Sequence, residues 1–190
     1  YTATNRTYDG TTSIAVTGGS TDIVSGDTVN FSETAALASK AAGNGRTVNV
    51  SNIALSGTDG GNYALTATTT TTTADIAKKS LTASYTAANT TYDGLTTATV
   101  TGVSTDVVAG DAVTFGQTAN FANKNAGSGK SVSITGITLG GADGANYELT
   151  ATTAGAIADI AKKAITVAYA GTNKTYDGTT SATVTGSSAD

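Results

Sequence analysis

Apolar residues alternate with polar ones along several short stretches of this sequence. Leu81, Ala83 and Tyr85 are separated by threonine and serine, and this period of two predicts a β-strand with one buried face. No segment shows the i, i+3, i+4, i+7 apolar spacing of an amphipathic helix, and threonine's branched side chain is restricted in a helix. The alternation recurs at 97–101, 113–121, 132–139 and 147–160, with a change of phase at Gly136 that indicates a β-bulge.

Glycine-rich turns separate these predicted strands. They lie at 92–94, 109–111, 126–129 and 140–144, and glycine beside Asp, Asn or Ser is typical of tight turns. Short strands between frequent turns predict an all-β fold, and we expect small sandwiches of the immunoglobulin-like (Ig-like) kind.

The sequence repeats itself with a period of 84 residues. Residues 1–84 and 85–168 align without a gap and are identical at 47 of 84 positions. A unit of this length is domain-sized and too long for one coil of a solenoid. We therefore expect tandem domains at 1–79 (lacking its first strand), 80–163 (complete) and 164–190 (the start of a third repeat). The arbitrary phase of the ends and the lack of methionine lead us to expect a piece of a longer array.

Composition and charge narrow the chemistry. The chain has no Cys, His, Met, Pro or Trp, and its net charge is -4. Thiol and imidazole catalysts, disulfides and His/Cys metal sites are therefore excluded. The acidic balance and the lack of a basic stripe argue against nucleic acid as a partner, and no apolar run is long enough for membrane insertion. We expect a structural protein without a cofactor, not an enzyme.

Four ordered motifs resemble the YDG-type repeat of large bacterial surface adhesins. They are Tyr-Asp-Gly, Ala-Gly-x-Gly-Lys/Arg-x-Val, Asp-Gly-x-Asn-Tyr-x-Leu and Ala-Asp-Ile-x-Lys, and both repeats contain all four. The resemblance implies an extracellular shaft repeat of a filamentous-haemagglutinin-like exoprotein from a Gram-negative bacterium, exported by two-partner secretion. It also raises a β-grasp-like core as the alternative to the sandwich. Ala77 and Ala161 depart from the pattern, because a proline is expected before the lysine.

The Tyr-Asp-Gly motif is the first candidate site. We interpret it as a capped turn and not as a ligand site: Asp accepts hydrogen bonds from backbone N–H groups, Gly adopts a positive φ, and Tyr plugs the core. We expect Phe31, Phe115, Tyr63 and Tyr147 to be largely buried, as well as the first two motif tyrosines. The motif residues are Tyr8, Asp9, Gly10, Tyr92, Asp93, Gly94, Tyr176, Asp177 and Gly178.

Oxygen-bearing side chains provide weak calcium candidates. These are Asp22 with Asp27, and Asp59 with Asn62. The sequence lacks the acidic density of a strong calcium loop and keeps no bidentate Glu, so we predict that no metal is bound.

Lys40 recurs as Lys124. One interpretation is a lysine that forms an isopeptide bond with the help of Asp9 or Asp75. The favoured one is a solvated lysine at the end of an edge strand. Possible glycosylation sequons begin at one repeat position in all three copies, at Asn5, Asn89 and Asn173.

We expect these repeats to form the load-bearing shaft of a secreted adhesin at the bacterial cell surface, projecting a distal binding domain. Its partners are then the neighbouring repeats of the same chain. One alternative is a filament subunit that associates head to tail by strand donation. The other is a module whose repeats each bind a glycan or surface ligand weakly, with avidity from repetition.

Overall fold

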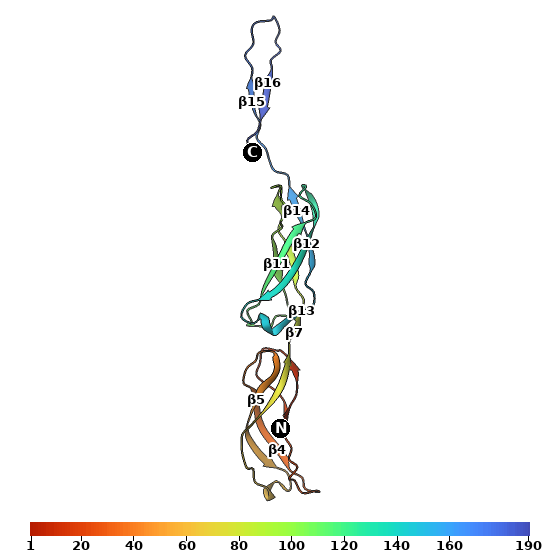
Figure 1. The fold of residues 1–190 in the computed structure, drawn as a ribbon, viewed down its shortest axis with the longest axis vertical. Coiled ribbons are helices and arrows are strands. Elements are labelled where there is room, and N and C mark those ends of the chain that lie inside the picture. Colours follow the sequence, from red (N-terminus) through yellow and green to blue (C-terminus); the bar gives the residue numbers. More distant parts are fainter. The chain divides into compact units, whose positions relative to one another are not determined.

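The structure, a computed structural model, describes residues 1–190 and is all-β (Figure 1). The prediction of an all-β chain is confirmed. Its only helical segments are two 3-10 turns of three residues each, η1 (Gly60–Asn62) and η2 (Gly144–Asn146). No helix of the chain has the length and apolar character needed to span a membrane.

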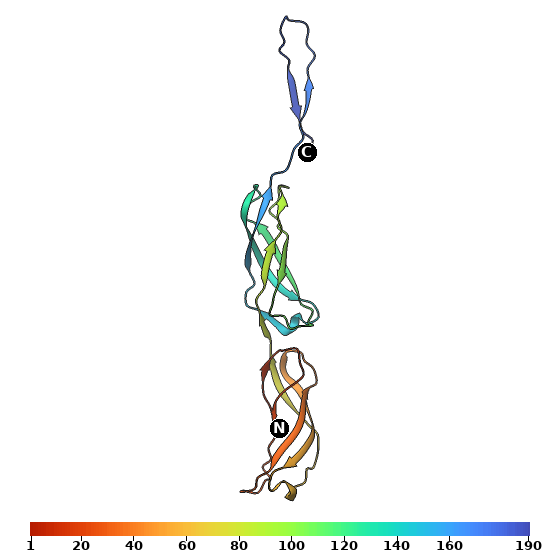
Figure 2. The same cartoon turned by 180° about the vertical axis from the view of Figure 1, so that it is seen from behind.

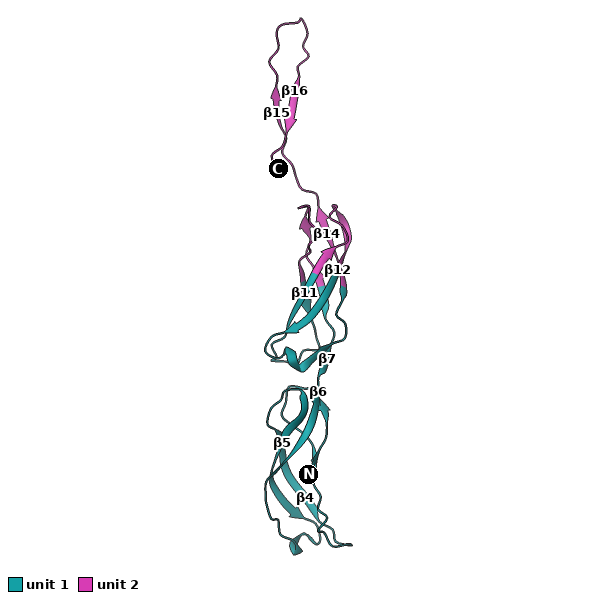
Figure 3. Cartoon of the chain, in the orientation of Figure 1, with its two compact units in different colours: residues 1–85, 101–118, 134–154 teal, residues 86–100, 119–133, 155–190 magenta.

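The contacts divide the chain into two compact units (Figure 3). Unit 1 contains residues 1–85, 101–118 and 134–154, and unit 2 contains residues 86–100, 119–133 and 155–190. Unit 1 thus joins the whole first repeat to one end of the second. The domain boundaries at 79 and 163 stay a prediction.

The first repeat is built on a four-stranded sheet of order β2-β6-β5-β4. Strand β5 is antiparallel to both of its neighbours, whereas β2 is parallel to β6. A separate antiparallel pair consists of β1 (Thr2–Ala3) and β3 (Val16–Thr17). The sheet strands are β2 (Arg6–Thr7), β4 (Asn30–Leu37), β5 (Gly43–Ser56) and β6 (Thr70–Ala77).

The long strand β5 is irregular. Its register against β4 shifts between Ser32 and Thr34, and Asn52 has a φ of 54°. Gly136, where the sequence predicts a bulge, has a φ of 63° at the equivalent position of the second repeat. Glycine adopts this left-handed conformation without strain, whereas Asn adopts it at a modest cost.

The three long strands of the first repeat have counterparts of equal length in the second repeat. One sheet has the order β11-β12-β14-β9, and β8 pairs with β10. Strand β7 (Lys79–Leu81) is parallel to β13 (Tyr147–Leu149), and the first repeat has no such pair. The remaining strands are β8 (Ser84–Ala87), β9 (Thr90–Thr91), β10 (Val100–Val103), β11 (Thr114–Phe121), β12 (Gly127–Gly140) and β14 (Ala154–Ala161).

The last part of the chain is an exposed hairpin. Strand β15 (Ala168–Gly171) pairs with β16 (Val184–Ser187) in antiparallel register (Figure 2). Every residue from 161 to 190 is exposed, including Tyr169 and Tyr176. This hairpin has the strand bounds of β8 and β10 plus 84, but no sheet covers it.

The hydrophobic core of unit 1 is continuous across the repeat boundary. Its buried cluster includes Tyr8, Val48 and Ile76 from the first repeat and Leu81 and Tyr147 from the second. The burial prediction holds for Tyr8 and Tyr147, each 2% exposed. The other four aromatic residues are partly buried, and two of them, Phe31 and Phe115, pack against the core cluster: Phe31, Tyr63, Tyr92 and Phe115.

Candidate functional site

The Tyr-Asp-Gly motif forms the same turn in all three copies. The carboxylate of Asp9 accepts a hydrogen bond from the N–H two residues later at 2.8 Å, and Asp93 and Asp177 do the same at 2.8 and 2.9 Å. The glycine φ angles are 81°, 83° and 72°. Such turns are stabilised by the short Asp side chain and by glycine's tolerance of positive φ.

In two of the three turns a basic side chain forms an ion pair with the motif aspartate. Arg6 forms an ion pair with Asp9, and Lys174 contacts Asp177 at 2.9 Å. The Arg6 guanidinium lowers the pKa of the Asp9 carboxyl to about 2. The second copy has Thr90 at this position, so the cation is not required for the turn.

The tyrosines of the three motifs differ in their surroundings. Tyr8 is 2% exposed, Tyr92 is partly buried and Tyr176 is 94% exposed. The exposure of each tyrosine depends on what packs against it, and Tyr8 alone has a following repeat packed on it. Its hydroxyl donates to Asp111 of the second repeat at 2.7 Å.

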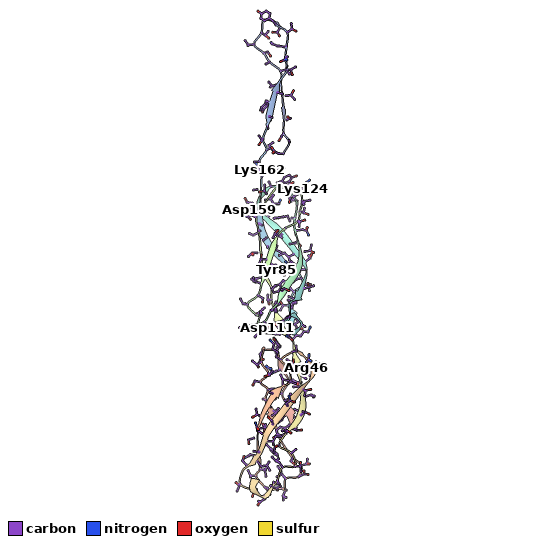
Figure 4. The ribbon with its side chains drawn as sticks, turned by 90° about the vertical axis from the view of Figure 1, so that its left-hand side faces the viewer. Arg46, Tyr85, Asp111, Lys124, Asp159 and Lys162 are labelled. Carbon is purple, nitrogen blue, oxygen red and sulfur yellow. The ribbon has the colours of Figure 1, made fainter.

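Asp111, which is labelled in Figure 4, accepts three hydrogen bonds at this junction. Its Oδ2 accepts from Tyr8 and from Tyr147, each at 2.7 Å. Its Oδ1 accepts from Lys40 Nζ at 2.8 Å, and the Asp111 side chain is 2% exposed. Lys40 also lies 3.4 Å from Asp143. A buried carboxylate is stable only when paired and hydrogen-bonded in this way.

Aromatic and apolar groups pack around Asp111 and its hydrogen-bond partners. The rings of Tyr8 and Tyr147 meet edge to face, with centroids 5.5 Å apart and planes at 73°. Lys40 Nζ lies 5.9 Å from the Tyr8 ring centroid. A Cβ on Gly10 would come within 2.7 Å of Val108 Cγ1, so the turn itself touches the second repeat.

A further hydrogen bond fixes the relation between the two repeats. The N–H of Ala42 donates to the Asn146 side chain at 3.0 Å. Asn146 is buried as well, at 8% exposure. Ala42 and Asn146 both belong to motifs that the sequence repeats.

Burial and hydrogen bonding shift the pKa values of the ionisable side chains at the junction. Burial, with a hydrogen bond to Asp111, raises the pKa of Tyr147 to about 12 and also raises that of Tyr8. Burial alone would raise the pKa of Asp111, but the hydrogen bonds from Lys40, Tyr147 and Tyr8 outweigh it and lower that pKa. The hydrogen bond to Asp111 raises the pKa of Lys40. The junction is therefore built for a charged Asp111, a charged Lys40 and neutral tyrosines.

The first repeat has the equivalents of the residues that accept hydrogen bonds at the junction, but no neighbouring repeat covers them. Tyr63 donates to Asp27 Oδ2 at 2.7 Å and accepts from the N–H of Val24 at 2.9 Å. The equivalent bonds of Tyr147, to Asp111 and from Val108, have the same lengths. Val24 is 64% exposed and Asn62 is exposed, whereas Val108 and Asn146 are covered.

The second repeat has the equivalents of the donor residues Tyr8 and Lys40, and no following repeat covers them either. Lys124 is exposed and Tyr92 is partly buried. An open cleft of about 660 Å³ is lined there by Tyr92, Asp93, Asn125, Ala126, Lys162, Lys163, Ile165 and Asp190.

The calcium candidates take part in local hydrogen bonds. Asp27 accepts from Tyr63, and Asp59 accepts from the N–H of Thr28 at 2.8 Å. Asp22 bonds within its own turn with Ser20, and the N–H of Asn62 donates to the carbonyl of Asp59. No three acidic side chains of residues 1–190 come together as metal ligands.

Lys40 is the residue whose environment differs most from the sequence interpretation. It contacts Asp111 and Asp143 of the second repeat, not Asp9 or Asp75. Lys40 does follow the edge strand β4 and its side chain is 41% exposed, as expected, but its ion pairs with the second repeat were not expected; Lys124 is exposed.

The sequon asparagines have a structural partner. The Asn5 side chain accepts a hydrogen bond from the N–H of Asp75 at 2.8 Å, and Asn89 accepts from Asp159 at the same distance. Asn5, Asn89 and Asn173 are all exposed. In the first two copies the side chain thus links the start of the repeat to its last strand.

Sequence reasoning missed Lys40, Asp111 and Asn146 as junction residues. Their recurrence was visible, since Gly-Asp, Asn-Tyr and the lysine repeat at the 84-residue offset. A repeated residue signals a repeated role, but it does not show that its partner lies in the next repeat.

Comparison with known proteins gives one match. A family model described as YDG domain matches residues 1–72 and again residues 77–154. No curated protein and no solved structure matches the chain.

Proposed function

This chain belongs to the YDG domain family, and on that premise we propose that it is a load-bearing shaft segment of a secreted bacterial surface adhesin. Its tandem 84-residue units, each a small β-sandwich, stack end to end and carry a distal binding domain away from the cell. The role is structural and extracellular, and the partners are neighbouring units of the same chain.

The parallel pairing of an early strand with the last sheet strand of each repeat carries this proposal. In the first repeat, Arg6 of β2 pairs with Ile76 of β6. In the second, Thr90 of β9 pairs with Ile160 of β14. Each repeat therefore places a strand near its beginning beside its last sheet strand, with both running in the same direction.

Parallel pairing between the beginning and the end of a repeat resists stretching. When the two ends of a repeat are pulled apart, parallel neighbours slide along each other, so their hydrogen bonds are loaded together and not one at a time. The short β2 ladder is extended by the N–H of Tyr8, which donates to the carbonyl of Ala77 at 2.8 Å, and by the Asn5–Asp75 bond. This arrangement suits a segment that transmits tension.

The junction supports the same role. Tyr8 and Lys40 of the first repeat donate hydrogen bonds to the buried carboxylate of Asp111 in the second, without a glycine- or proline-rich linker between the repeats. Such linkers make connections flexible or act as separate spacers. A direct junction favours the transmission of force and orientation from one repeat to the next.

Single-molecule force spectroscopy on the chain, held at its two ends, tests the proposal. Each complete repeat should unfold in one step. Its 84 residues, at roughly 3.3–3.6 Å each, have an extended length of about 28–30 nm, and the step should equal that length minus the end-to-end distance of the folded repeat. Asn5→Ala should lower the unfolding force of the first repeat, whereas Asn49→Ala, on an exposed position of β5, should not. Gradual extension at low force without such steps would contradict a load-bearing role.

The cellular location needs its own test. Antibodies raised against the chain should label intact cells of the producing bacterium, and external protease should remove the signal. Signal that is found only after lysis would refute the extracellular placement.

A further inference from the structure

One asparagine of this chain is followed by glycine. Of the twelve asparagines, Asn44 alone precedes a glycine, Gly45, whereas every other one precedes a larger residue. Glycine matters chemically at this place, because its backbone nitrogen has no Cβ beside it and can approach the side-chain carbonyl carbon of the asparagine. Attack by that nitrogen closes a cyclic imide, a succinimide, and releases ammonia.

The two residues lie in a bulge at the start of β5. The register of β5 against β6 shifts between Gly43 and Arg46, and Gly45 has a φ of 60°. Asn44 and Gly45 are both exposed, and a Cβ added to Gly45 would meet nothing within 4 Å. Water therefore reaches the peptide group between them, and ammonia can leave it.

A carboxylate lies at the reacting nitrogen. The N–H of Gly45 donates to Oδ1 of Asp75 at 2.7 Å, which is within the distance over which a general base accepts a proton. Asp75 belongs to β6, and its own N–H donates to the Asn5 side chain at 2.8 Å. The base is thus positioned by the sheet.

The second repeat has the same geometry without the amide. Ser128 is the 84-residue equivalent of Asn44. The next residue, Gly129, has a φ of 61°, and its N–H donates to Oδ1 of Asp159, labelled in Figure 4, at the same 2.7 Å. A serine hydroxyl offers no carbonyl carbon for the nitrogen to attack, so the ring cannot close there. The chain thus contains a natural control.

We propose that Asn44 is a site of self-catalysed deamidation, with Asp75 as the base. Asp75 takes the proton of the Gly45 N–H as that nitrogen bonds to Cγ of Asn44. The bond from Cγ to the amide nitrogen breaks, and the proton passes from Asp75 to the leaving ammonia. Water then opens the ring at either carbonyl and leaves aspartate or isoaspartate at position 44. One water is consumed and one ammonia is released, and nothing is oxidised or reduced.

The product changes β5 close to the junction between the repeats. Conversion adds one negative charge to a chain of net charge -4, near the carboxylate of Asp75. Isoaspartate also adds one carbon atom to the backbone before Gly45, which displaces the Gly45 N–H from Asp75. Ala42, two residues before Asn44, donates its N–H to Asn146 of the second repeat. Deamidation should therefore weaken both contacts as the protein ages, whatever the chain's role as a shaft.

Peptide mass spectrometry of the full chain, incubated at neutral pH and then digested with trypsin, tests the site. Cleavage after Lys40 and Arg46 releases residues 41–46, in which Asn44 is the only asparagine. This peptide should gain the mass of an amide-to-acid conversion with time and separate into aspartyl and isoaspartyl forms, while the other asparagines stay unchanged. No conversion at position 44, or equal conversion at several asparagines, overturns the proposal.

Two variants of the full chain test the base. Asp75→Asn keeps an oxygen that accepts the same hydrogen bond but removes the carboxylate, so the conversion rate at Asn44 should fall roughly tenfold or more. Ser128→Asn places an amide before the Gly129 N–H, and position 128 should then convert as Asn44 does. An unchanged rate in Asp75→Asn, or no conversion at position 128, overturns the assignment of the base.

Urea denaturation of aged protein tests the consequence for β5. The midpoint of the natural chain should be lower after conversion than before it. Asn44→Ser, which copies the second repeat, should keep its midpoint through the same incubation. Equal midpoints for the fresh and the converted natural chain overturn the proposed weakening.

Discussion

Replacing Asp111 with alanine should destabilise the protein far more than replacing its repeat equivalent, Asp27. Asp111→Ala leaves the hydroxyls of Tyr8 and Tyr147 without an acceptor in a site where both residues are 2% exposed. Each buried unsatisfied hydroxyl costs about 1–3 kcal/mol, so we expect a loss of about 2–6 kcal/mol. The contact with Lys40 adds little, because its side chain is 41% exposed.

Asp27 is the matched control. It accepts the same hydrogen bond from Tyr63, but Tyr63 is only partly buried and no second repeat covers it. Water can replace the lost acceptor there, so Asp27→Ala should cost no more than about 1 kcal/mol.

Urea denaturation followed by tyrosine fluorescence measures both free energies of unfolding. A double-mutant cycle of Tyr8→Phe with Asp111→Ala should show a coupling of about 1–3 kcal/mol. Equal losses for Asp111→Ala and Asp27→Ala, or no coupling with Tyr8, would refute the junction as the reason for the difference.

Further predictions concern the Asn5 hydrogen bond, the titration of Asp111 and Tyr147, and the calcium candidates. Asn5→Ala should lower the free energy of unfolding by about 1 kcal/mol through loss of the Asp75 hydrogen bond. An unchanged urea midpoint would show that this bond does not stabilise the fold. Stability should fall as pH drops below the ordinary Asp value of 3.8 and through the lowered pKa of folded Asp111, because the unfolded chain takes up the proton first. Stability should also fall as pH rises from 10 to about 12, because tyrosine in the unfolded chain loses its proton before Tyr147 does in the folded protein. A flat stability profile over either pH range would contradict the shifted pKa values of Asp111 and Tyr147. Excess calcium and a chelator should give equal melting temperatures, since Asp27 and Asp59 are engaged by Tyr63 and Thr28; a rise of several degrees in calcium would show a bound ion.

The strands were predictable because each repeat alternates apolar and polar residues between glycine turns. The stretch at 113–121 became β11, and that at 132–139 lies within β12. The Tyr-Asp-Gly turn was also predictable, since its geometry depends on three adjacent residues.

The junction was not predictable in the same way. The burial of Tyr8 and the position of Lys40 depend on Asp111, which is 103 and 71 residues away along the chain. Copies of one repeat have nearly the same local sequence, so Tyr8 and Tyr92 look alike until the following repeat is placed. Their different exposure is a tertiary effect, and only the fold shows it.

The most direct test of the account is whether the two repeats tumble together in solution. Backbone ¹⁵N relaxation can compare amides of the first repeat, such as Val48 and Val50, with Leu139 and Tyr147 beyond the junction, all within unit 1. We predict one shared rotational correlation time for both sets in the natural chain, and two shorter ones in Tyr8→Ala. Separate correlation times in the natural chain would contradict a junction held by Tyr8, Lys40 and Asp111.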